Sequence, residues 1–310
     1  MGMVEYRNVA INNQQDLLDE IFSFAADNGW DTWPSDGVIG RASDNCFVRI
    51  WAESGDTRII PGRGYPGSGT VLDEQAPHYS RILNNSTIWN VPFSYQGAVH
   101  LFAHEDPHCI YVIFNYSTDA YQWLCFGSLE KYVPFDGGAF AHGSFTINLH
   151  SSGANINETN VTTGQYVQAL FVGARFSTIS QGASRLYANL GDGEPTFWRN
   201  NSGWSSFSPY CRWSWRSSPH LTGLVAGRSV NEWNAQTVFM PVWCYASRPD
   251  GFWSLLGHCP GIRHVNMANF SREQEITVGE KTYKMFPWFQ RRTDGVGTGT
   301  WGSALEMPEA

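Results

Sequence analysis

The amino-acid sequence predicts a mainly β protein. We expect multi-stranded antiparallel sheets packed in a sandwich-like manner, one N-terminal amphipathic helix, and long loops rich in Gly, Pro and Trp. Three observations lead to this fold class. Apolar or alternating runs rich in Val, Ile, Phe, Tyr and Trp recur along the 310 residues, and such runs form strands. The chain holds 31 Gly and 15 Pro, which supply turns. Helical periodicity is confined to one stretch.

The predicted helix spans residues 12–29. Asn12 or Asn13 is expected to cap its first turn, because an Asn side chain accepts a hydrogen bond from a free backbone N–H. Gly29 is expected just beyond its last turn. Its apolar side chains recur at helical spacing and would cover a sheet; they are Leu17, Leu18, Ile21, Phe22 and Ala25.

Strands follow the helix in the first half of the chain. Residues 46–51 and 57–60 have strand composition, and the Gly/Pro-rich stretch 61–70 is expected to be a loop. Residues 97–126 hold three strand-like segments and predict a three-stranded meander. The Gly-rich, aromatic residues 134–144 are expected to form another loop.

A polar, Asn- and Thr-rich stretch at residues 151–164 marks the expected domain boundary. It separates a helix-plus-sheet domain, residues 1–150, from a second β-rich domain, residues 151–310. The second domain would end in a Gly-rich C-terminal arm. Residues 191–220 are expected to be irregular and rich in Trp.

The clearest internal pattern lies between residues 251 and 289. His258–Gly261 predicts a turn, because Pro fixes φ and Gly accepts positive φ. Strands are expected at residues 262–267, 275–278 and 282–286, with a tight turn at Gly279–Glu280. An earlier strand, residues 236–245, contains Pro241, which predicts an edge position or a bulge.

Charge and hydropathy argue against several classes of function. The chain has 28 acidic and 20 basic residues, a net charge of −8, and three lysines (Lys131, Lys281 and Lys284), which suits nucleic-acid phosphates poorly. Its apolar runs are too short for membrane insertion. The N-terminus lacks the pattern of a secretory signal. We therefore expect the six cysteines to be free, largely buried thiols.

His100, His104 and His108 are the one group with metal-like spacing. On a helix the first two would share a face and could hold zinc. The flanking alternation predicts a strand instead, where they share a face but lie roughly 13 Å apart. We interpret them as structural histidines and predict no metal site and no cofactor.

The candidate catalytic groups have simpler explanations. His258 and Cys259 could act as base and nucleophile, but neighbours on a strand point to opposite faces. The carboxylate pairs Asp73–Glu74 and Glu105–Asp106 lie in predicted turns, where acidic residues commonly form turns. No catalytic residue is predicted, and an enzyme is not the expected class. Paired carboxylates and the Trp-rich residues 198–215 keep a sugar-binding or glycan-cleaving protein as the alternative.

Two segments, residues 102–145 and 257–289, carry a family resemblance. The first has an aromatic strand pair around a Glu-Asp-Pro turn, then FGSLEK and GGAF; the second has PGIRHVN and VGEKTYKMFPW. Together with the helix ending in Asn-Gly-Trp, they resemble virion structural proteins from the tail and baseplate region of long-tailed, double-stranded DNA bacteriophages. The resemblance implies a non-enzymatic building block, assembled in the host cytoplasm and carried in the virion.

Low charge and abundant aromatic residues agree with a subunit that has large permanent interfaces. We expect homo-oligomers that also connect neighbouring tail or baseplate proteins. The alternative is a carbohydrate-binding or glycan-cleaving protein of the phage adsorption apparatus. The sheet at residues 251–289 is expected to present aromatic side chains at its edge. The predicted interface residues are Trp204, Trp213, Trp215, Phe286, Trp288, Phe289 and Trp301.

Overall fold

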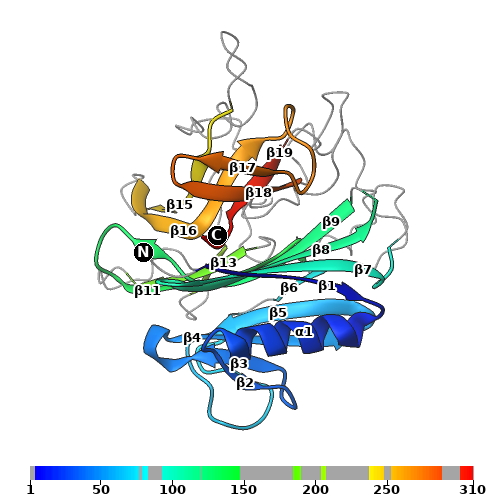
Figure 1. The fold of residues 1–310 in the computed structure, drawn as a ribbon. Coiled ribbons are helices and arrows are strands. Elements are labelled where there is room, and N and C mark those ends of the chain that lie inside the picture. The colour runs from blue at the N-terminus through cyan, green and yellow to red at the C-terminus, as the bar shows by residue number, and fades with distance from the viewer. Residues whose placement is uncertain are drawn as a thin grey trace.

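A computed structural model describes most of the first half of the chain and parts of the second. The described residues are 4–76, 79–82, 93–118, 120–146, 184–189, 204–206, 237–247, 253–287 and 301–309. They form three antiparallel sheets and one α-helix, stacked as lower, middle and upper layers (Figure 1). The predicted mainly β, sandwich-like fold class is confirmed. No described helix is both long and apolar enough to span a membrane.

The middle sheet contains the predicted meander, and seven described strands pair in it. Their order is β1 (Val4–Ile11), β7 (Gly97–Glu105), β8 (His108–Ser117), β9 (Ala120–Ser128), β11 (Asp136–Gly143), β13 (Ser184–Asn189) and β14 (Trp204–Ser206). The loop predicted at residues 134–144 is wrong over most of its length, because β11 forms there. Phe140 and its two Ala neighbours are buried, so this segment gains from pairing as a strand inside the molecule.

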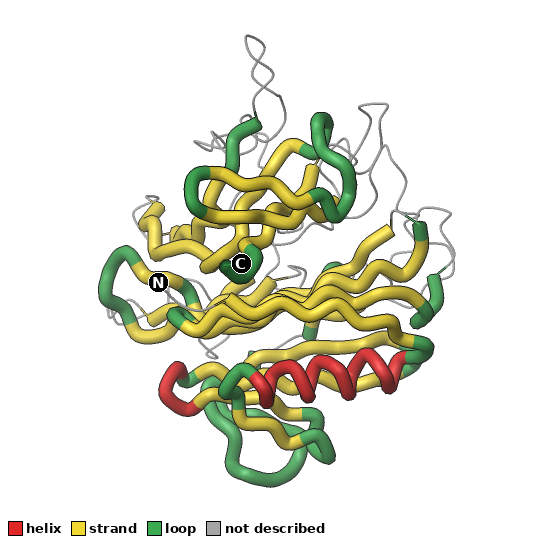
Figure 2. The backbone as a smooth tube through the Cα atoms, viewed as in Figure 1, coloured by secondary structure: helices red, strands yellow, loops and turns green. Residues whose placement is uncertain are grey.

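The lower layer combines the helix with a six-stranded sheet. Its strands are β2 (Asp31–Trp33), β3 (Val38–Arg41), β4 (Cys46–Glu53), β5 (Asp56–Gly62), β6 (Ser80–Ile82) and β12 (Phe145–Thr146), with a short 3₁₀ helix η1 (Ala42–Asp44). Helix α1 (Gln14–Asp27) lies in front of this sheet (Figure 2). Asn13 caps it by accepting from the N–H of Asp16, and Gly29 follows it with φ +76°. The predicted helix, its cap and its end are therefore confirmed.

The upper sheet holds the described strands from the C-terminal part of the chain, together with β10. Its members are β10 (Glu130–Lys131), β15 (Met240–Ser247), β16 (Trp253–Asn266), β17 (Glu275–Val278), β18 (Lys281–Pro287) and β19 (Trp301–Glu306). The hairpin that turns at Gly279 is confirmed. The bulge predicted at Pro241 is also confirmed, because the β15–β16 register shifts between Pro241 and Val242.

The turn predicted at His258–Gly261 is wrong, because β16 continues through these residues without ending. Pro260 and Gly261 lie within the β15–β16 register shift, where Cys259 pairs with Val242 and Arg263 with Pro241. The extra residues of a bulge accommodate both the missing proline N–H and the positive φ of Gly261. Pro and Gly therefore bend this strand and do not end it.

Two apolar cores lie on opposite faces of the middle sheet. Val112 and Leu124 face α1 and the lower sheet, whereas Tyr111 and Trp123 face the upper sheet. Side chains alternate between faces along a strand, so strands covered on both sides require nearly continuous apolar runs. This requirement explains the sequences of β8 and β9, whose residues are almost all buried.

The strand pairing crosses the predicted domain boundary after residue 150. β13 lies beyond that boundary and pairs with β11, for example through Leu186 opposite Phe140. The upper core also combines Trp123 with Phe286 and Val242. The ranges 1–150 and 151–310 therefore do not correspond to separate sheets.

Candidate functional site: a polar pocket between the middle and upper sheets

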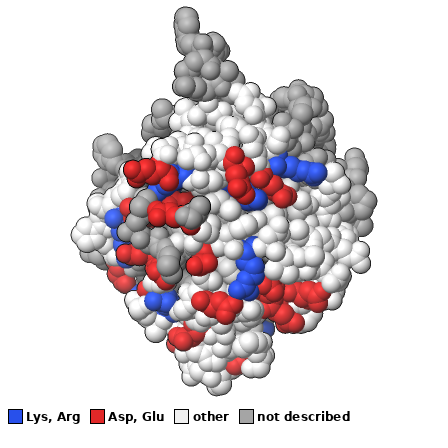
Figure 3. Space-filling view, in the orientation of Figure 1, with Lys and Arg blue, Asp and Glu red and all other residues white. Residues whose placement is uncertain are grey.

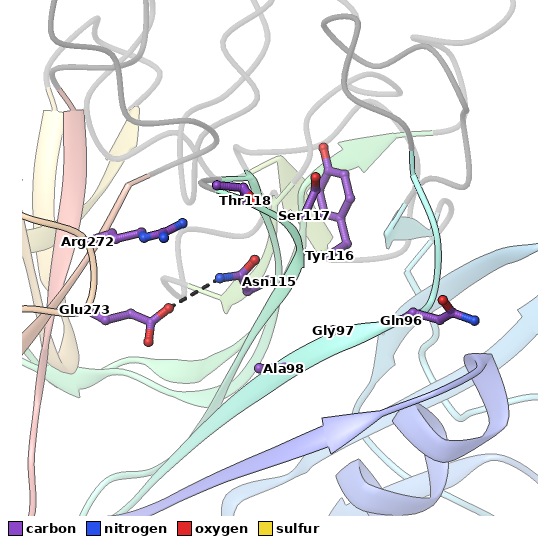
Figure 4. A pocket seen from close by; sticks show the side chains of 9 residues that line it. All are labelled: Gln96, Gly97, Ala98, Asn115, Tyr116, Ser117, Thr118, Arg272 and Glu273. Atoms are coloured by element: carbon purple, nitrogen blue, oxygen red, sulfur yellow. Dashed lines mark hydrogen bonds between the residues drawn. The ribbon is translucent and has the colours of Figure 1, made fainter.

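A pocket of about 420 Å³ opens where the ends of β7 and β8 meet a loop of the upper sheet. Asn115, Ser117 and Thr118 come from the end of β8 and the turn after it, and Gln96 precedes β7. Arg272 and Glu273 lie opposite them on the loop between β16 and β17 (Figure 4). The pocket thus draws its polar groups from segments that are far apart in sequence.

Glu273 occupies an unusual backbone conformation on that loop. Its φ is +55°, a region that residues with a Cβ seldom adopt. Its backbone N–H donates to the carbonyl of Met285 at 2.6 Å, and the N–H of Met285 donates to the carbonyl of Gln274 at 2.9 Å. The loop is therefore tied to β18, and the strained backbone directs the Glu273 side chain toward the middle sheet.

The carboxylate of Glu273 joins the upper sheet to three strands of the middle sheet. Its Oε1 accepts hydrogen bonds from the Tyr121 hydroxyl at 2.9 Å and from the Asn115 side-chain amide at 3.3 Å. The Nε2 of His100 lies 3.6 Å from the same oxygen. On the far side of the imidazole, Nδ1 lies 2.9 Å from the hydroxyl of Tyr6. These groups form one continuous polar chain between the sheets.

Burial sets the protonation states of the side chains in this polar chain. It lowers the pKa of His100 to about 4, although Glu273 lies beside it, so the imidazole is neutral at neutral pH. Burial opposes ionisation of Glu273, but His100 and the hydrogen bonds from Tyr121 and Asn115 leave its pKa below the ordinary value. Glu273 is therefore the charged member of the chain.

In space, Glu273, His100 and Tyr6 follow one another in the order of the carboxylate, base and hydroxyl of a nucleophilic catalytic triad. Burial raises the pKa of Tyr6, so its hydroxyl keeps its proton and is a weak nucleophile. The pocket lining instead offers amides, hydroxyls, a guanidinium and one carboxylate. Such a set suits recognition of a polar, hydroxyl-bearing ligand through hydrogen bonds.

Phe286, one of the predicted interface residues, is a core residue. Its side chain is fully buried, and its ring centroid lies 4.9 Å from that of His100 and about 6.0 Å from those of Tyr121 and Trp123. β18 lies inside the upper sheet and turns this side chain toward the middle sheet. Phe286 is therefore not available to a neighbouring subunit, which contradicts its predicted place in the interface.

The other predicted interface residues are placed only in part. Trp204 begins β14 and pairs with Tyr187, and Trp301 begins β19 and pairs with Asn266; these are backbone positions. Trp213, Trp215, Trp288 and Phe289 lie outside the described residues. An interface role for these six residues stays a prediction.

The histidine group adopts the predicted strand arrangement. His100 and His104 lie four positions apart on the same face of β7 and are buried. His108 begins β8 and pairs with Asp44, with 3.2 Å between Nδ1 and Oδ2. In the described part of the chain, no three His, Cys, Asp or Glu side chains could hold a metal ion.

His258 and Cys259 also separate as predicted. His258 pairs with Glu130 at 3.3 Å, whereas Cys259 is buried beside Cys244 in the upper core. Burial raises the pKa of the Cys259 thiol well above its ordinary value, so it stays protonated. The five cysteines within the described residues are free and buried, as predicted; Cys211 lies outside them.

Glu273 is not among the functional residues that the sequence predicts. It lies between Arg272 and Gln274 in an ordinary polar connector. Its partners Asn115 and Tyr121 are 158 and 152 positions away, and only the packing of two sheets brings them together. The chain matches no protein-family model and no curated protein.

Proposed function

We propose that this protein is a structural component of a bacteriophage tail or baseplate, which acts by oligomeric assembly and by connecting neighbouring tail proteins. The resemblance of residues 102–145 and 257–289 points to this class. One structural observation supports an assembly role: residues Tyr132–Pro134, here called the apolar loop, are exposed side by side. Tyr132 and Val133 are 46% and 43% exposed.

The apolar loop is held firmly at both ends. Before it, β10 pairs with β16, and the backbone N–H of Tyr132 donates to the carbonyl of Leu256 at 2.9 Å. After it, the ammonium of Lys131 donates to the carbonyl of Phe135 at 3.2 Å. Consecutive apolar side chains presented by a fixed backbone bind a partner at a small entropic cost. Exposed apolar groups of this kind mark interaction sites.

The test is to change the apolar loop in the phage that encodes the chain. Replacing Tyr132 and Val133 together with Ser should leave a folded protein that is missing from purified particles. Val71 is 67% exposed and lies on another part of the molecule, so Val71→Ser is the matched control and should be incorporated normally. Particles that contain the loop variant at the wild-type level would contradict the assembly role of the loop.

Glycan binding is the second candidate function, and the pocket at Glu273 favours it. Its lining contributes several hydrogen-bonding groups and one carboxylate. Cleavage of a glycosidic bond usually requires two carboxylates, so the pocket favours binding over hydrolysis. A screen of the purified chain against bacterial surface glycans tests this candidate.

A glycan ligand would be located with substitutions at the pocket rim. Gln96 and Thr118 are exposed lining residues, so their replacement by Ala should weaken binding and leave folding intact. Gln15 is exposed on α1, in the lower layer on the other side of the middle sheet (Figure 1), and Gln15→Ala provides the control. Saturable binding that the rim variants do not change would assign the glycan to another surface.

A further inference from the structure

The outer edge of β1 is open within the described part of the chain. All eight residues of β1 pair in continuous register with β7, from Val4 opposite His104 to Ile11 opposite Gly97. No described strand pairs with the other side of β1, which is the front edge of the middle sheet (Figure 1). A regular edge strand of this length presents backbone N–H and C=O groups to any extended segment that reaches it.

A groove of about 420 Å³ runs beside this edge. Glu5, Tyr6 and Arg7 of β1 form one side, and Phe24 and Asp27 of α1 lie opposite them. Arg41, Glu105 and His108 close the groove at its end. Acidic and basic side chains gather on this face of the molecule, over α1 and the adjoining edge of the middle sheet (Figure 3).

The basic side chains of the groove already lie beside carboxylates of the same chain. Arg7 pairs with Glu20 at 2.9 Å and with Asp27 at 2.6 Å. Asp44 lies 3.7 Å from the Nε of Arg41 and 3.2 Å from the Nδ1 of His108. Each of these three basic side chains therefore already has a carboxylate of the same protein beside it.

Two carboxylates remain, those of Glu5 and Glu105. Neither forms an ion pair or a side-chain hydrogen bond with another described residue. Glu5 pairs with Ala103, and Glu105 lies two residues further along β7, so both side chains lie on the lower face of the sheet. Diagonal neighbours of this kind are roughly 7–8 Å apart. The groove thus has two unmatched negative charges beside an open strand edge.

We propose that β1 receives an extended, basic segment of a neighbouring protein as an additional strand of the middle sheet. The backbone of that segment would bond to the free edge of β1. Alternate Lys or Arg side chains would lie opposite Glu5 and reach Glu105, because residues that face each other across paired strands share a sheet face. The inference rests on the proposed assembly function and specifies one partner surface for it.

The test measures binding of synthetic peptides to the full-length chain by fluorescence anisotropy. The probe is a short peptide of alternating Lys and Val; its twin has Glu in place of each Lys. We expect saturable binding of the Lys peptide, weakened by salt, and no binding of the Glu peptide. A Lys peptide N-methylated at alternate backbone positions loses main-chain donors, and it should bind at least about tenfold more weakly.

The variant Glu5→Gln/Glu105→Gln removes both charges and keeps the shapes of the side chains. It should weaken binding of the Lys peptide by about tenfold or more. Glu280→Gln provides the matched control, because Glu280 is an exposed carboxylate in the turn between β17 and β18 and does not line the groove. Hydrogen exchange should show slower exchange of β1 amides when the Lys peptide is bound.

Three results would overturn the proposal. They are equal binding of the Lys and Glu peptides, unchanged affinity in the double variant, and self-association of the chain that protects β1 without any peptide. The last result would assign the edge to a second copy. The binding assay uses purified protein, whereas the assembly role is read from particles. Failure of this inference is therefore distinguishable from failure of the proposed function.

Discussion

The hydroxyl of Tyr121 donates a 2.9 Å hydrogen bond to the carboxylate of Glu273, which links the middle and upper sheets across 152 positions of sequence. Tyr121 is fully buried in β9, and Glu273 is the charged end of the polar chain that includes His100. This contact crosses the boundary between the two layers, so it contributes to the fixed position of the upper sheet over the middle one. Glu273 also lines the polar pocket.

We expect Tyr121→Phe and Glu273→Gln each to lower the free energy of unfolding by about 1–2 kcal/mol, because the first removes a hydrogen bond to a charged group and the second removes the charge that strengthens it. In a double-mutant cycle by urea denaturation, the coupling energy should be about 1 kcal/mol. Glu280→Gln changes an exposed carboxylate in the turn after β17 and should alter stability by less than about 0.5 kcal/mol. Fully additive effects of the first two changes would contradict a direct contact.

Acidification should destabilise the fold through its buried histidines. Burial lowers the pKa of His100 and His104 to about 4 and that of His264 to about 3. As the pH falls below about 6.5, the unfolded chain takes up protons that the folded chain does not accept. Stability is therefore fully present above pH 6.5 and is lost as the pH falls toward 4.

The change in the free energy of unfolding per pH unit can be assigned to single histidines. Each buried histidine contributes up to roughly 1.4 kcal/mol per pH unit between its unfolded and folded pKa values. His104→Asn should lower stability at pH 7 but make the pH dependence shallower by that amount, measured by urea denaturation between pH 7.5 and 5. An unfolding free energy that stays constant over this range would show that these side chains are not buried in neutral form.

The sequence predicted the local elements better than their boundaries and partners. The α1 cap at Asn13 and the strands of the meander depend on neighbouring residues, and they are correct. The turn expected at Pro260–Gly261 failed because the same two residues also suit a bulge, and the choice depends on pairing with β15. Strand β1 was not predicted at all, since its alternation is weak and its pairing with β7 spans about a hundred positions.

The candidate site was hidden for a related reason. Glu273 is recognisable only after the upper sheet has packed on the middle one, and no local pattern distinguishes it from Glu275 or Glu280. Phe286 was misassigned because periodicity shows that a side chain alternates with its neighbours but does not show which face is covered. The structure covers that face with Phe102, Tyr121 and Trp123.

Phe286→Ala should therefore destabilise the fold. It should not give a stably folded subunit that only fails to assemble. Loss of a fully buried aromatic ring leaves a cavity and costs about 3–5 kcal/mol, so a lower midpoint in urea is expected. Val278→Ala on the exposed edge of the same sheet is the control, with Val278 44% exposed, and should change stability by less than about 0.5 kcal/mol. A Phe286→Ala protein with wild-type stability would contradict the burial of the Phe286 side chain.

Two glycines of the upper sheet separate backbone strain from packing. Gly261 and Gly279 have nearly equal φ values of +63° and +65°. A Cβ at Gly279 would meet open space, whereas a Cβ at Gly261 would overlap the imidazole ring of His104 in the middle sheet.

Gly279→Ala should lower the free energy of unfolding by about 1 kcal/mol, the strain of a left-handed residue with a Cβ. Gly261→Ala should cost a further 1–3 kcal/mol or so, because the layers must separate or His104 must move. Thermal and urea unfolding of both variants measures the difference. Equal costs at the two positions would mean that β16 does not lie against His104, and the contact between the upper and middle sheets would have to be placed elsewhere.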